Sequence, residues 1–460
     1  MKINEVKNVL KMSVDFILRS PLLLRSGEEG EFTDSTIERT ADGRLLHVNG
    51  YVWASLLRRS LTRLNNTEEL VKRIGKYDEK EESWGVSSLW CESSFSSYSG
   101  GDVRPGIKIN RKWGAVATGA LYSDEIEMPG QILTMNFYYF CAGDDKAQEI
   151  RDKFLAALLV INEGIENIGG GWSYGFGRLS VADVRVEICN LTEKDKRGCL
   201  WKFEDLCRLD HDQVFRVPLS VRKDMGWTKI RIQGSLEKGQ MLAIHSNHPV
   251  SDMYEKYKEL TDAFVFRRLR VRDDRTGINS EPVITGKAFR QAILSIPIER
   301  WLHTEGVDIC KTPGELCTCD ECIQYRVKIN RRENNPKCKC RRCQWFGATD
   351  KGGIIAVLDA PVIDPRETIL HRIQLCEHSF QNIQLFSGEY LTGGTFITEI
   401  IIDYKQVPKD AEELESRIYH IINELGGTVP SPPGWYRLGA TATCTGQFTM
   451  KGCEKYHVGR

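Results

Sequence analysis

The sequence predicts an α+β protein of two tandem units, each an antiparallel sheet with helices on one face, as in ferredoxin-like folds. Three observations lead to this prediction. The order strand, loop, strand, helix, hairpin, strand, helix, strand occurs twice, and the spacing within the two copies is similar. A cluster of cysteines accounts for the extra length of the second copy. At 460 residues, the chain is long enough for two or three domains.

The first copy spans residues 1–190. It contains a polar, acidic loop with Asp34 and Arg39, a turn at Asn49-Gly50 and a helix that carries arginines. Alternating apolar residues predict strands, apolar residues at a period of 3.6 predict helices, and polar, serine-rich segments predict loops. The predicted elements are strands over 14–24, 132–140 and 179–188, a hairpin around Gly114 and Gly119, a helix over 146–165 and a loop over 65–100.

The second copy keeps this order. Gly50 and Gly130 are separated by 80 residues in the first copy, and Gly286 and Gly394 by 108 in the second. The excess is about the size of the cysteine cluster, which we therefore interpret as an insertion. The predicted boundaries are a charged linker over 191–213, the second copy over 214–460 and the insertion over about 303–345, with strands over 229–236 and 395–404 and a helix over 411–425.

The composition is that of a folded, soluble protein, with 41% hydrophobic and 27% charged residues. No apolar run reaches the roughly 18 residues of a membrane span, and the N-terminus has no signal-peptide core. A cytoplasmic location is therefore expected. The 63 basic residues balance 63 acidic ones, which argues against a uniformly basic surface but not against a local basic groove.

Seven of the 15 cysteines lie between residues 310 and 343. Two Cys-x-x-Cys pairs in this segment predict a four-thiolate zinc site, which would be structural because four protein ligands leave no open position. Unliganded thiols in a loop are the alternative. The first-choice ligands are Cys319, Cys322, Cys340 and Cys343, and Cys317, Cys338, Cys310 and His303 are candidates to replace some of them or to hold a second ion.

The segment between these pairs is basic, with Glu333 as its one acid. Such a zinc-pinned knuckle suits a phosphate backbone, although a solubilising loop has the same composition. A glycine run over 169–177 follows a predicted helix and precedes a strand, the reverse of a dinucleotide-binding turn. Its glycines allow backbone N–H groups to approach a phosphate chain, or they form a helix C-terminus with a tight turn.

The segment GGGWSYGFGR, residues 169–178, resembles the glycine-rich loop of the RAMP superfamily, the repeat-associated RNA-binding proteins of CRISPR systems. The order from TDSTIER through DGRLLHVNG to the basic helix resembles the backbone subunits of type III CRISPR effector complexes. Trp345-Phe346-Gly347 to Asp359-Ala360 is similar to a further family motif. The resemblance covers nearly the whole chain as two fused units of a III-D-like group, and it is weaker in the second, where the sequence after Gly426-Gly427 departs from the loop motif.

The resemblance implies RRM-like RAMP domains with thumb-like hairpins that stack along a CRISPR guide RNA beside other effector subunits. A thumb, here about 104–122, kinks the guide–target duplex, and a loop aspartate supports metal-dependent cleavage of target RNA. The matching aspartate is Asp34, which would otherwise be interpreted as a loop-capping residue. With a reference pKa near 3.9, an aspartate is a poor base, so it is better placed to bind Mg²⁺ or to orient the 2′-OH.

The second copy has Arg267 at the position of Asp34 and no aspartate within four residues of it. It is therefore predicted to bind RNA without cutting, unless this segment is a half-exposed strand with solvated arginines. Several other residues are expected to contact RNA, although each has an ordinary structural interpretation as well. The expected RNA-binding residues are Arg39, Arg58, Arg59, Lys108, Arg111, Trp113, Gly170, Gly171, Ser173, Gly175, Gly177, Arg178, Arg267, Arg268, Lys287 and Arg290.

The leading hypothesis is an endoribonuclease that acts only within the assembled complex, through Asp34, with structural zinc and with Mg²⁺ or another divalent cation for cleavage. The alternative is a catalytically silent, RNA-binding structural subunit of the same complex. A guide-processing endonuclease is a third hypothesis, and it requires a base such as histidine near the glycine run. None is present there.

Overall fold

The computed structural model describes most of the chain, and the α+β prediction is confirmed. The described residues are 6–458 with the exception of 31–32, 76, 79–82, 85–86, 98–100, 111–114, 144, 192–213, 217–226, 237–240, 243, 247–263, 274–276, 308, 310–318, 330–338, 349–351, 376–381, 405–407 and 427–447.

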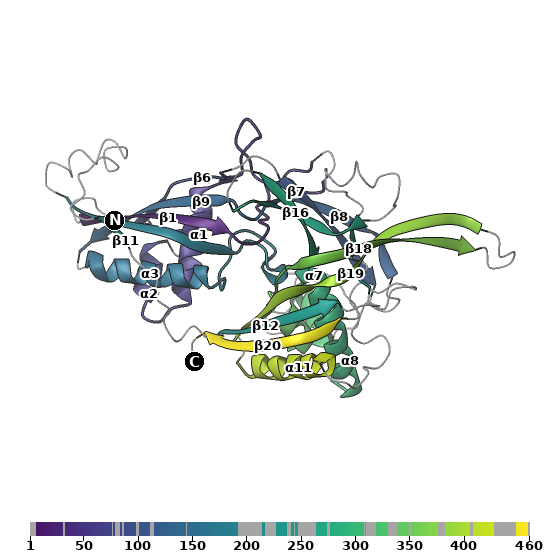
Figure 1. Cartoon of the computed structure of the whole chain (residues 1–460). Coiled ribbons are helices and arrows are strands. Elements are labelled where there is room, and N and C mark those ends of the chain that lie inside the picture. The colour runs from purple at the N-terminus through teal and green to yellow at the C-terminus, as the bar shows by residue number, and fades with distance from the viewer. Residues whose placement is uncertain are drawn as a thin grey trace.

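The first unit contains a five-stranded antiparallel sheet with the strand order β11-β10-β1-β9-β5 (Figure 1). Its strands are β1 (Val6–Leu18), β5 (Leu89–Cys91), β9 (Ile132–Ala142), β10 (Leu179–Asn190) and β11 (Val214–Arg216). Every second side chain is buried from Leu10 to Leu18, which is the period that places one face of a strand against a core. Because β11 pairs with β10, residues 214–216 extend the sheet of the first unit and lie outside that of the second.

Helices α1 (Gly50–Thr62) and α3 (Ala147–Asn162) contact each other and cover this sheet. The Asn49 side chain caps α1 by accepting a hydrogen bond from the N–H of Tyr51. Trp53 of α1 is fully buried, and its ring stacks on that of Phe16 in β1, with centroids 5.6 Å apart. Burial of large aromatic side chains of this kind contributes much of the stability of a core.

Two predicted bounds in the first unit were wrong. The first strand begins before residue 14 and ends at Leu18, because Pro21 lacks the N–H that a continued ladder requires. The predicted loop over 65–100 contains helix α2 (Glu68–Arg73) and strand β5. β5 has only three residues, too few to show a period-2 pattern.

The second unit has a seven-stranded antiparallel sheet with the order β15-β16-β18-β19-β12-β20, and β17 also pairs with β19. Its core order, β20-β12-β19-β17, repeats the order β10-β1-β9-β5 of the first sheet. The strands are β12 (Trp227–Leu236), β15 (Arg267–Val271), β16 (Ile278–Ile284), β17 (Ile355–Val357), β18 (Ala360–Leu375), β19 (Asn382–Asp403) and β20 (Thr449–Val458).

The helix that follows β16 occupies the place of α1. It consists of α7 (Gly286–Phe289), a π-helical turn η3 (Arg290–Ser295) and α8 (Ile296–Thr304). Both helices begin with a glycine that has no room for a side chain: a Cβ on Gly50 would overlap the carbonyl oxygen of Cys91 in β5, and one on Gly286 that of Val357 in β17. The two glycines therefore have equivalent positions, as their spacing in the sequence predicted.

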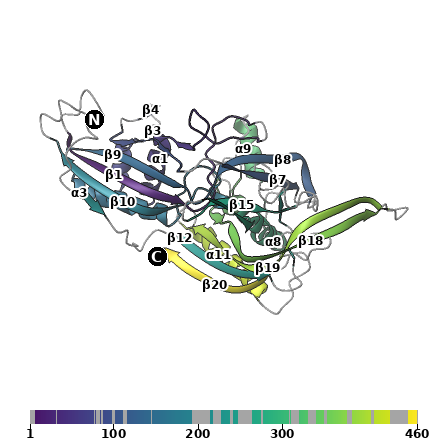
Figure 2. The same cartoon turned by 45° about the horizontal axis from the view of Figure 1, so that its top comes forward.

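Each unit also carries a hairpin. In the first unit it consists of β7 (Gly101–Asn110) and β8 (Ala115–Glu127), and in the second of β18 and β19. The second hairpin projects from the body of the molecule, as the green ribbons in Figures 1 and 2 show. Strand β19 is continuous over 22 residues, so it belongs to both the hairpin and the sheet.

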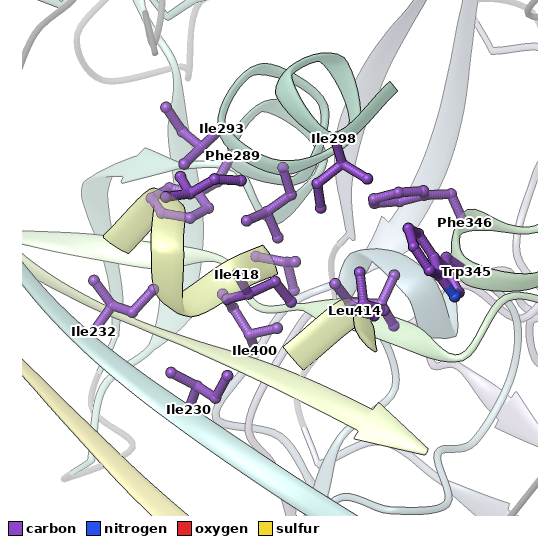
Figure 3. Packing of buried hydrophobic residues seen from close by; sticks show 14 of the residues in the cluster. Ile230, Ile232, Phe289, Ile293, Ile298, Trp345, Phe346, Ile400, Leu414 and Ile418 are labelled. Atoms are coloured by element: carbon purple, nitrogen blue, oxygen red, sulfur yellow. The ribbon is translucent and has the colours of Figure 1, made fainter. Parts of the chain in front are cut away.

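Helix α11 (Pro408–Gly426) covers the second sheet together with the helix that begins at Gly286 (Figure 3). Leu414 and Ile418 of α11 lie between Ile400 of β19 and the aromatic side chains of Trp345 and Phe346. These two residues belong to α10 (Arg341–Phe346), which begins directly after Cys340 and contains Cys343. The end of the cysteine segment is therefore part of the core.

The two units share a third apolar cluster. Leu159, Val160 and Ile165 of the first unit belong to it, and so do Trp227, Ala356 and Ile401 of the second. Salt bridges surround this contact. The pairs are Arg63–Asp403 (2.9 Å), Arg178–Glu399 (3.2 Å), Lys229–Glu163 (2.6 Å) and Arg104–Asp359 (2.7 Å). The units therefore form one packed body.

Within the described parts of the chain, no helix has both the length and the apolar character needed to cross a membrane.

Candidate functional site

Asp34 lies on the loop that follows β1 and is exposed to solvent. Its N–H donates a 2.8 Å hydrogen bond to the carbonyl oxygen of Ser123 in β8, and its Oδ2 accepts a 2.6 Å bond from the N–H of Ser123. The Ser123 hydroxyl lies 3.3 Å from the same oxygen. No residue in the described part of the chain donates to Oδ1. The carboxylate is therefore fixed through one oxygen and open to solvent at the other.

The next residue of β8, Asp124, holds the loop one residue beyond Asp34. Its Oδ1 accepts hydrogen bonds from the Ser35 hydroxyl (2.6 Å) and from Nη2 of Arg25 (3.0 Å). Asp124 is buried, whereas the Arg25 side chain is 59% exposed. Arg25 therefore presents a cation to solvent close to the loop of Asp34.

Glu125 holds the loop further along. Its Oε2 accepts a 3.0 Å hydrogen bond from the N–H of Ile37, and its Oε1 accepts one from Nη2 of Arg39 (2.5 Å). Arg39, an expected RNA contact, therefore forms an ion pair that positions the loop on the hairpin.

Glu127, at the end of β8, is fully buried. Its Oε1 accepts a hydrogen bond from the Gln131 side chain (2.8 Å), while Oε2 has no partner among the described residues. Burial raises the pKa of Glu127 to about 7, against a smaller opposite effect of the Arg39 cation. This carboxyl group is therefore poised to titrate near neutral pH at the base of the hairpin.

The glycine-rich loop packs against the second unit. A side chain on Gly175, which has φ +77°, would meet Leu358 beside β17, and one on Gly177 would overlap the carbonyl oxygen of Ile168. Gly170 is exposed and a side chain there would meet only ordinary contacts. Gly171 directly precedes a single helical turn, η2 (Trp172–Tyr174), and Ser173 lies within that turn. Two of the glycines expected to contact RNA are therefore explained by packing.

Three of the arginines expected to bind RNA in the first unit have protein partners. Arg58 donates to the carbonyl oxygen of Gly75 (2.9 Å), and Arg59 donates to Glu166 (3.0 Å). Arg178 reaches across to Glu399 of the second unit at 3.2 Å. These bonds orient the three guanidinium groups toward the protein.

Arg267 and Arg268 are also paired. Nη2 of Arg267 lies 2.5 Å from Glu367 and 3.2 Å from Glu389, and Nε of Arg268 lies 2.5 Å from Glu281. Both side chains are less than 10% exposed. Both of these expected RNA contacts are thus paired with carboxylates of the second unit.

Lys287 and Arg290 lie on the first turns of the helix that begins at Gly286. The ammonium group of Lys287 donates to the Tyr122 hydroxyl and lies 4.6 Å from the centre of that ring. Arg290 donates to the carbonyl oxygen of Phe346 and lies over the ring of Tyr174 (5.8 Å). Burial lowers the pKa of Lys287 from its usual range.

The first-choice zinc ligands are all buried in the core of the second unit. Cys319 precedes α9 (Asp320–Ile329), where its carbonyl oxygen accepts from the N–H of Cys322 (3.0 Å), and Cys340 and Cys343 open α10. Among the residues described, no three His, Cys, Asp or Glu side chains are grouped as metal ligands.

Some predicted residues lie outside the described residues. Arg111, Trp113, Cys310, Cys317 and Cys338 are among them, and the Lys108 side chain is not described either. His303 lies in the last turn of α8 and is exposed. Zinc binding therefore stays a prediction.

The part of the chain with the Asp34 loop and the glycine-rich loop matches a known family. Residues 16–180 match the RAMP superfamily. The match starts near the end of β1 and ends near the start of β10, so it covers the hairpin, both loops, and strands β5 and β9 of the first unit. It supports the RAMP family as the origin of this unit, and it favours a CRISPR-associated, RNA-binding subunit. No curated protein matches the chain.

Sequence reasoning missed the residues of the first unit that hold Asp34. Ser123, Asp124 and Glu125 lie almost 90 residues from the loop, and nothing in the local pattern connects the two segments. The succession of two acids in a strand was the available signal, because adjacent acidic residues are uncommon in strands. Buried Asp359, which pairs with Arg104, was noted only as part of a motif.

Proposed function

We propose that the chain is a guide-RNA-binding backbone subunit of a type III CRISPR effector complex of the III-D-like group. It consists of two ferredoxin-like RAMP units in tandem and cleaves target RNA in the first. The proposal depends most on the exposed Asp34 carboxylate, which is fixed through Oδ2 at the base of the β7–β8 hairpin. The RAMP match contains both this loop and this hairpin.

The strand orders support the tandem arrangement. The order β10-β1-β9-β5 with α1 and α3 is that of a ferredoxin-like unit, and the second unit repeats it as β20-β12-β19-β17. The equivalent glycines Gly50 and Gly286 support the same alignment. Each unit then has one thumb-like hairpin, β7–β8 or β18–β19.

Asp34 fits a divalent cation. Mg²⁺ binds through one or two carboxylates and completes its shell with water and substrate phosphates, so one open aspartate oxygen is a sufficient protein contribution. When bound, the metal would supply Lewis-acid stabilisation of charge on the phosphate. The role of Ser123 is to hold Asp34 Oδ2, so that Oδ1 keeps its direction without reorganisation at the moment of reaction.

The hairpin has a separate role. A nucleotide that is splayed from the stack brings its 2′-OH toward the line of attack on the adjacent phosphorus, which lowers the entropic part of the barrier. Because Asp34 is bonded to β8, the carboxylate and the element that would splay the nucleotide keep a constant relationship. We expect cleavage at the nucleotide beside the β7–β8 hairpin.

The second unit is proposed to be silent. Arg267 stands where the first unit has Asp34, and its guanidinium is occupied by Glu367 and Glu389. Both carboxylates are paired with this guanidinium, and Glu389 is buried as well. The second unit would therefore bind RNA and support the first unit, without cleaving RNA itself.

We also propose that the cysteine segment holds structural zinc. Four buried thiols in two Cys-x-x-Cys turns are the donor set that zinc prefers. The metal would have no part in the reaction.

The test is cleavage of target RNA by the reconstituted complex in Mg²⁺, with every cut mapped. Asp34→Ala should lose one cut and keep the others. Asp42→Ala is the matched control, since Asp42 is another exposed aspartate of the same loop region and is bonded to Thr40 rather than to the hairpin. An unchanged set of cuts in Asp34→Ala would leave the silent structural subunit as the function, and loss of two cuts would make the second unit active.

A further inference from the structure

Lys287 lies in this region and has no carboxylate partner among the described residues. Its ammonium group donates to the Tyr122 hydroxyl and lies over the rings of Tyr122 (4.6 Å) and Tyr174 (5.5 Å). Among the described residues it forms no salt bridge, whereas neighbouring arginines such as Arg104 and Arg39 each have one. An ammonium group has three donors, so it can accept an anion in addition to the phenol oxygen.

Lys287 comes from the second unit, but its partner belongs to the hairpin of the first. Tyr122 is the residue before Ser123, which holds Asp34. Adjacent residues of a strand rise by about 3.4 Å, so the lysine and the aspartate reach β8 at neighbouring positions. Lys287 of the second unit and Asp34 of the first therefore contact adjacent residues of β8, through the side chain of Tyr122 and the backbone of Ser123.

The position of Tyr122 is itself specified by the strand beside it. A side chain on Gly106 of β7 would overlap the ring of Tyr122, so glycine at this position lets the ring lie across the hairpin. The ring then forms the surface on which the Lys287 ammonium rests. Aromatic faces attract cations without neutralising them, which keeps the charge available.

The other ionisable groups that face Lys287 do not fully compensate its positive charge. They are Tyr174 of the glycine-rich loop, Arg104 of β7 and Asp124 of β8. Asp124 is already bonded to Ser35 and Arg25, so it is shared with two other donors. The half-buried ammonium group is thus disfavoured as it stands, and an anion would compensate for the lost hydration.

We propose that Lys287 is a residue of the cleavage site of the first unit, where its ammonium group binds the scissile phosphate of target RNA across from Asp34. The site is then composite, with the aspartate from one unit and the cation from the other. A cation at the phosphate stabilises the charge that develops on its oxygens during attack by the 2′-OH. This inference rests on the proposed function and names a second residue of the same site.

The experiment uses the reconstituted complex with full-length chain, target RNA and Mg²⁺. It compares Lys287→Gln, Lys287→Arg, Tyr122→Phe and Asp34→Ala with wild type, and Lys146→Gln, on an exposed lysine before α3, is the control. The single-turnover rate of the Asp34-dependent cut, the Kd for target RNA and the melting temperature are measured for each.

We expect Lys287→Gln to slow this cut by about 10- to 100-fold while the other cuts, the Kd and the melting temperature stay close to wild type. Lys287→Arg should keep most of the rate because it keeps the charge. Tyr122→Phe, which removes only the hydroxyl anchor, should slow the same cut to a smaller extent. Lys146→Gln should match wild type.

Three results would overturn the inference: a wild-type rate in Lys287→Gln and Tyr122→Phe, equal losses in Lys287→Gln and Lys287→Arg together with a lower melting temperature, or a loss of target binding that accounts for the whole effect. The Asp34→Ala arm separates the two proposals. If Asp34→Ala keeps the cut, the proposed function fails. If Asp34→Ala loses it and Lys287→Gln does not slow it, only the role of Lys287 fails.

Discussion

Arg104, on the hairpin of the first unit, donates from Nη2 to both carboxylate oxygens of Asp359 in the second unit, at 2.9 and 2.7 Å. The guanidinium group lies between the rings of Phe176 (5.1 Å) and Phe266 (4.7 Å), and Asp359 also accepts from the N–H of Gly286 at 2.7 Å. Both charged side chains are less than 10% exposed. This pair connects the hairpin to the helix that carries Lys287.

Removal of one member of this pair should destabilise the chain strongly. Arg104→Met leaves Asp359 buried without its cation, which typically costs about 3–5 kcal/mol. Asp359→Asn should have a similar effect, and the double variant should lose less than the sum because neither charge is then left alone. Urea unfolding of the four proteins measures the coupling. Additive losses would show that the pair is not coupled.

Two glycines of one loop should respond differently to alanine. Gly177→Ala forces a Cβ into the carbonyl oxygen of Ile168 at φ +69°, so we expect a loss of about 1–3 kcal/mol. Gly170→Ala meets only ordinary contacts and should be close to neutral. Thermal unfolding of both variants is the measurement, and equal melting temperatures would contradict the packing described for Gly177.

Zinc content should depend on the buried thiols. Cys322→Ser and Cys343→Ser are expected to lose bound zinc and to lower the melting temperature, because both sulfur atoms are fully buried in the core of the second unit. Cys453→Ser, on β20, is the control and should keep its zinc. The zinc content of the purified proteins is the measurement. A full complement of zinc in Cys322→Ser would exclude Cys322 as a zinc ligand.

The stability of the protein should fall as pH rises through the titration of Glu127. Below pH 4.5, this group is protonated in both states, and between about 4.5 and 7 only the unfolded state releases the proton. The loss reaches about 3 kcal/mol above pH 7 and is then constant. The increase in melting temperature of Glu127→Gln over wild type should therefore be larger at pH 8 than at pH 5.

The exposed Glu149→Gln is the control for this pH dependence, since its carboxyl group lies in solvent beside Lys146. It should keep the wild-type fall in stability between pH 5 and pH 8. An unchanged fall in Glu127→Gln would assign the dependence to another group.

The long elements could be predicted from the sequence because their periods extend over many residues. The strands β9, β10 and β12 and the helices α3 and α11 lie within a few residues of their predicted bounds. Strands β5 and β17 were missed because three residues cannot display a period. They are the edge strands against which the helices that begin at Gly50 and Gly286 pack. The position of Lys287 in the fold could therefore not be predicted either.

The candidate site could be predicted only as far as it is local. Asp34 was predicted from the resemblance of its loop to the RAMP superfamily, but its partner Ser123 is 89 residues away. The arginines of β15 show the same limit: Glu367, which pairs with Arg267, lies 100 residues later and is invisible to a local pattern. Charge in a sequence predicts a binding surface only where the fold leaves that charge without a partner.

The apolar cluster between the units has a consequence for synthesis of the protein. Leu159, Val160 and Ile165 leave the ribosome long before Ile401, which covers them in the finished molecule. At about 5–20 residues per second, the interval is on the order of tens of seconds. During that time the nascent first unit presents an apolar face to its surroundings, so folding chaperones and expression temperature should govern the yield of this protein.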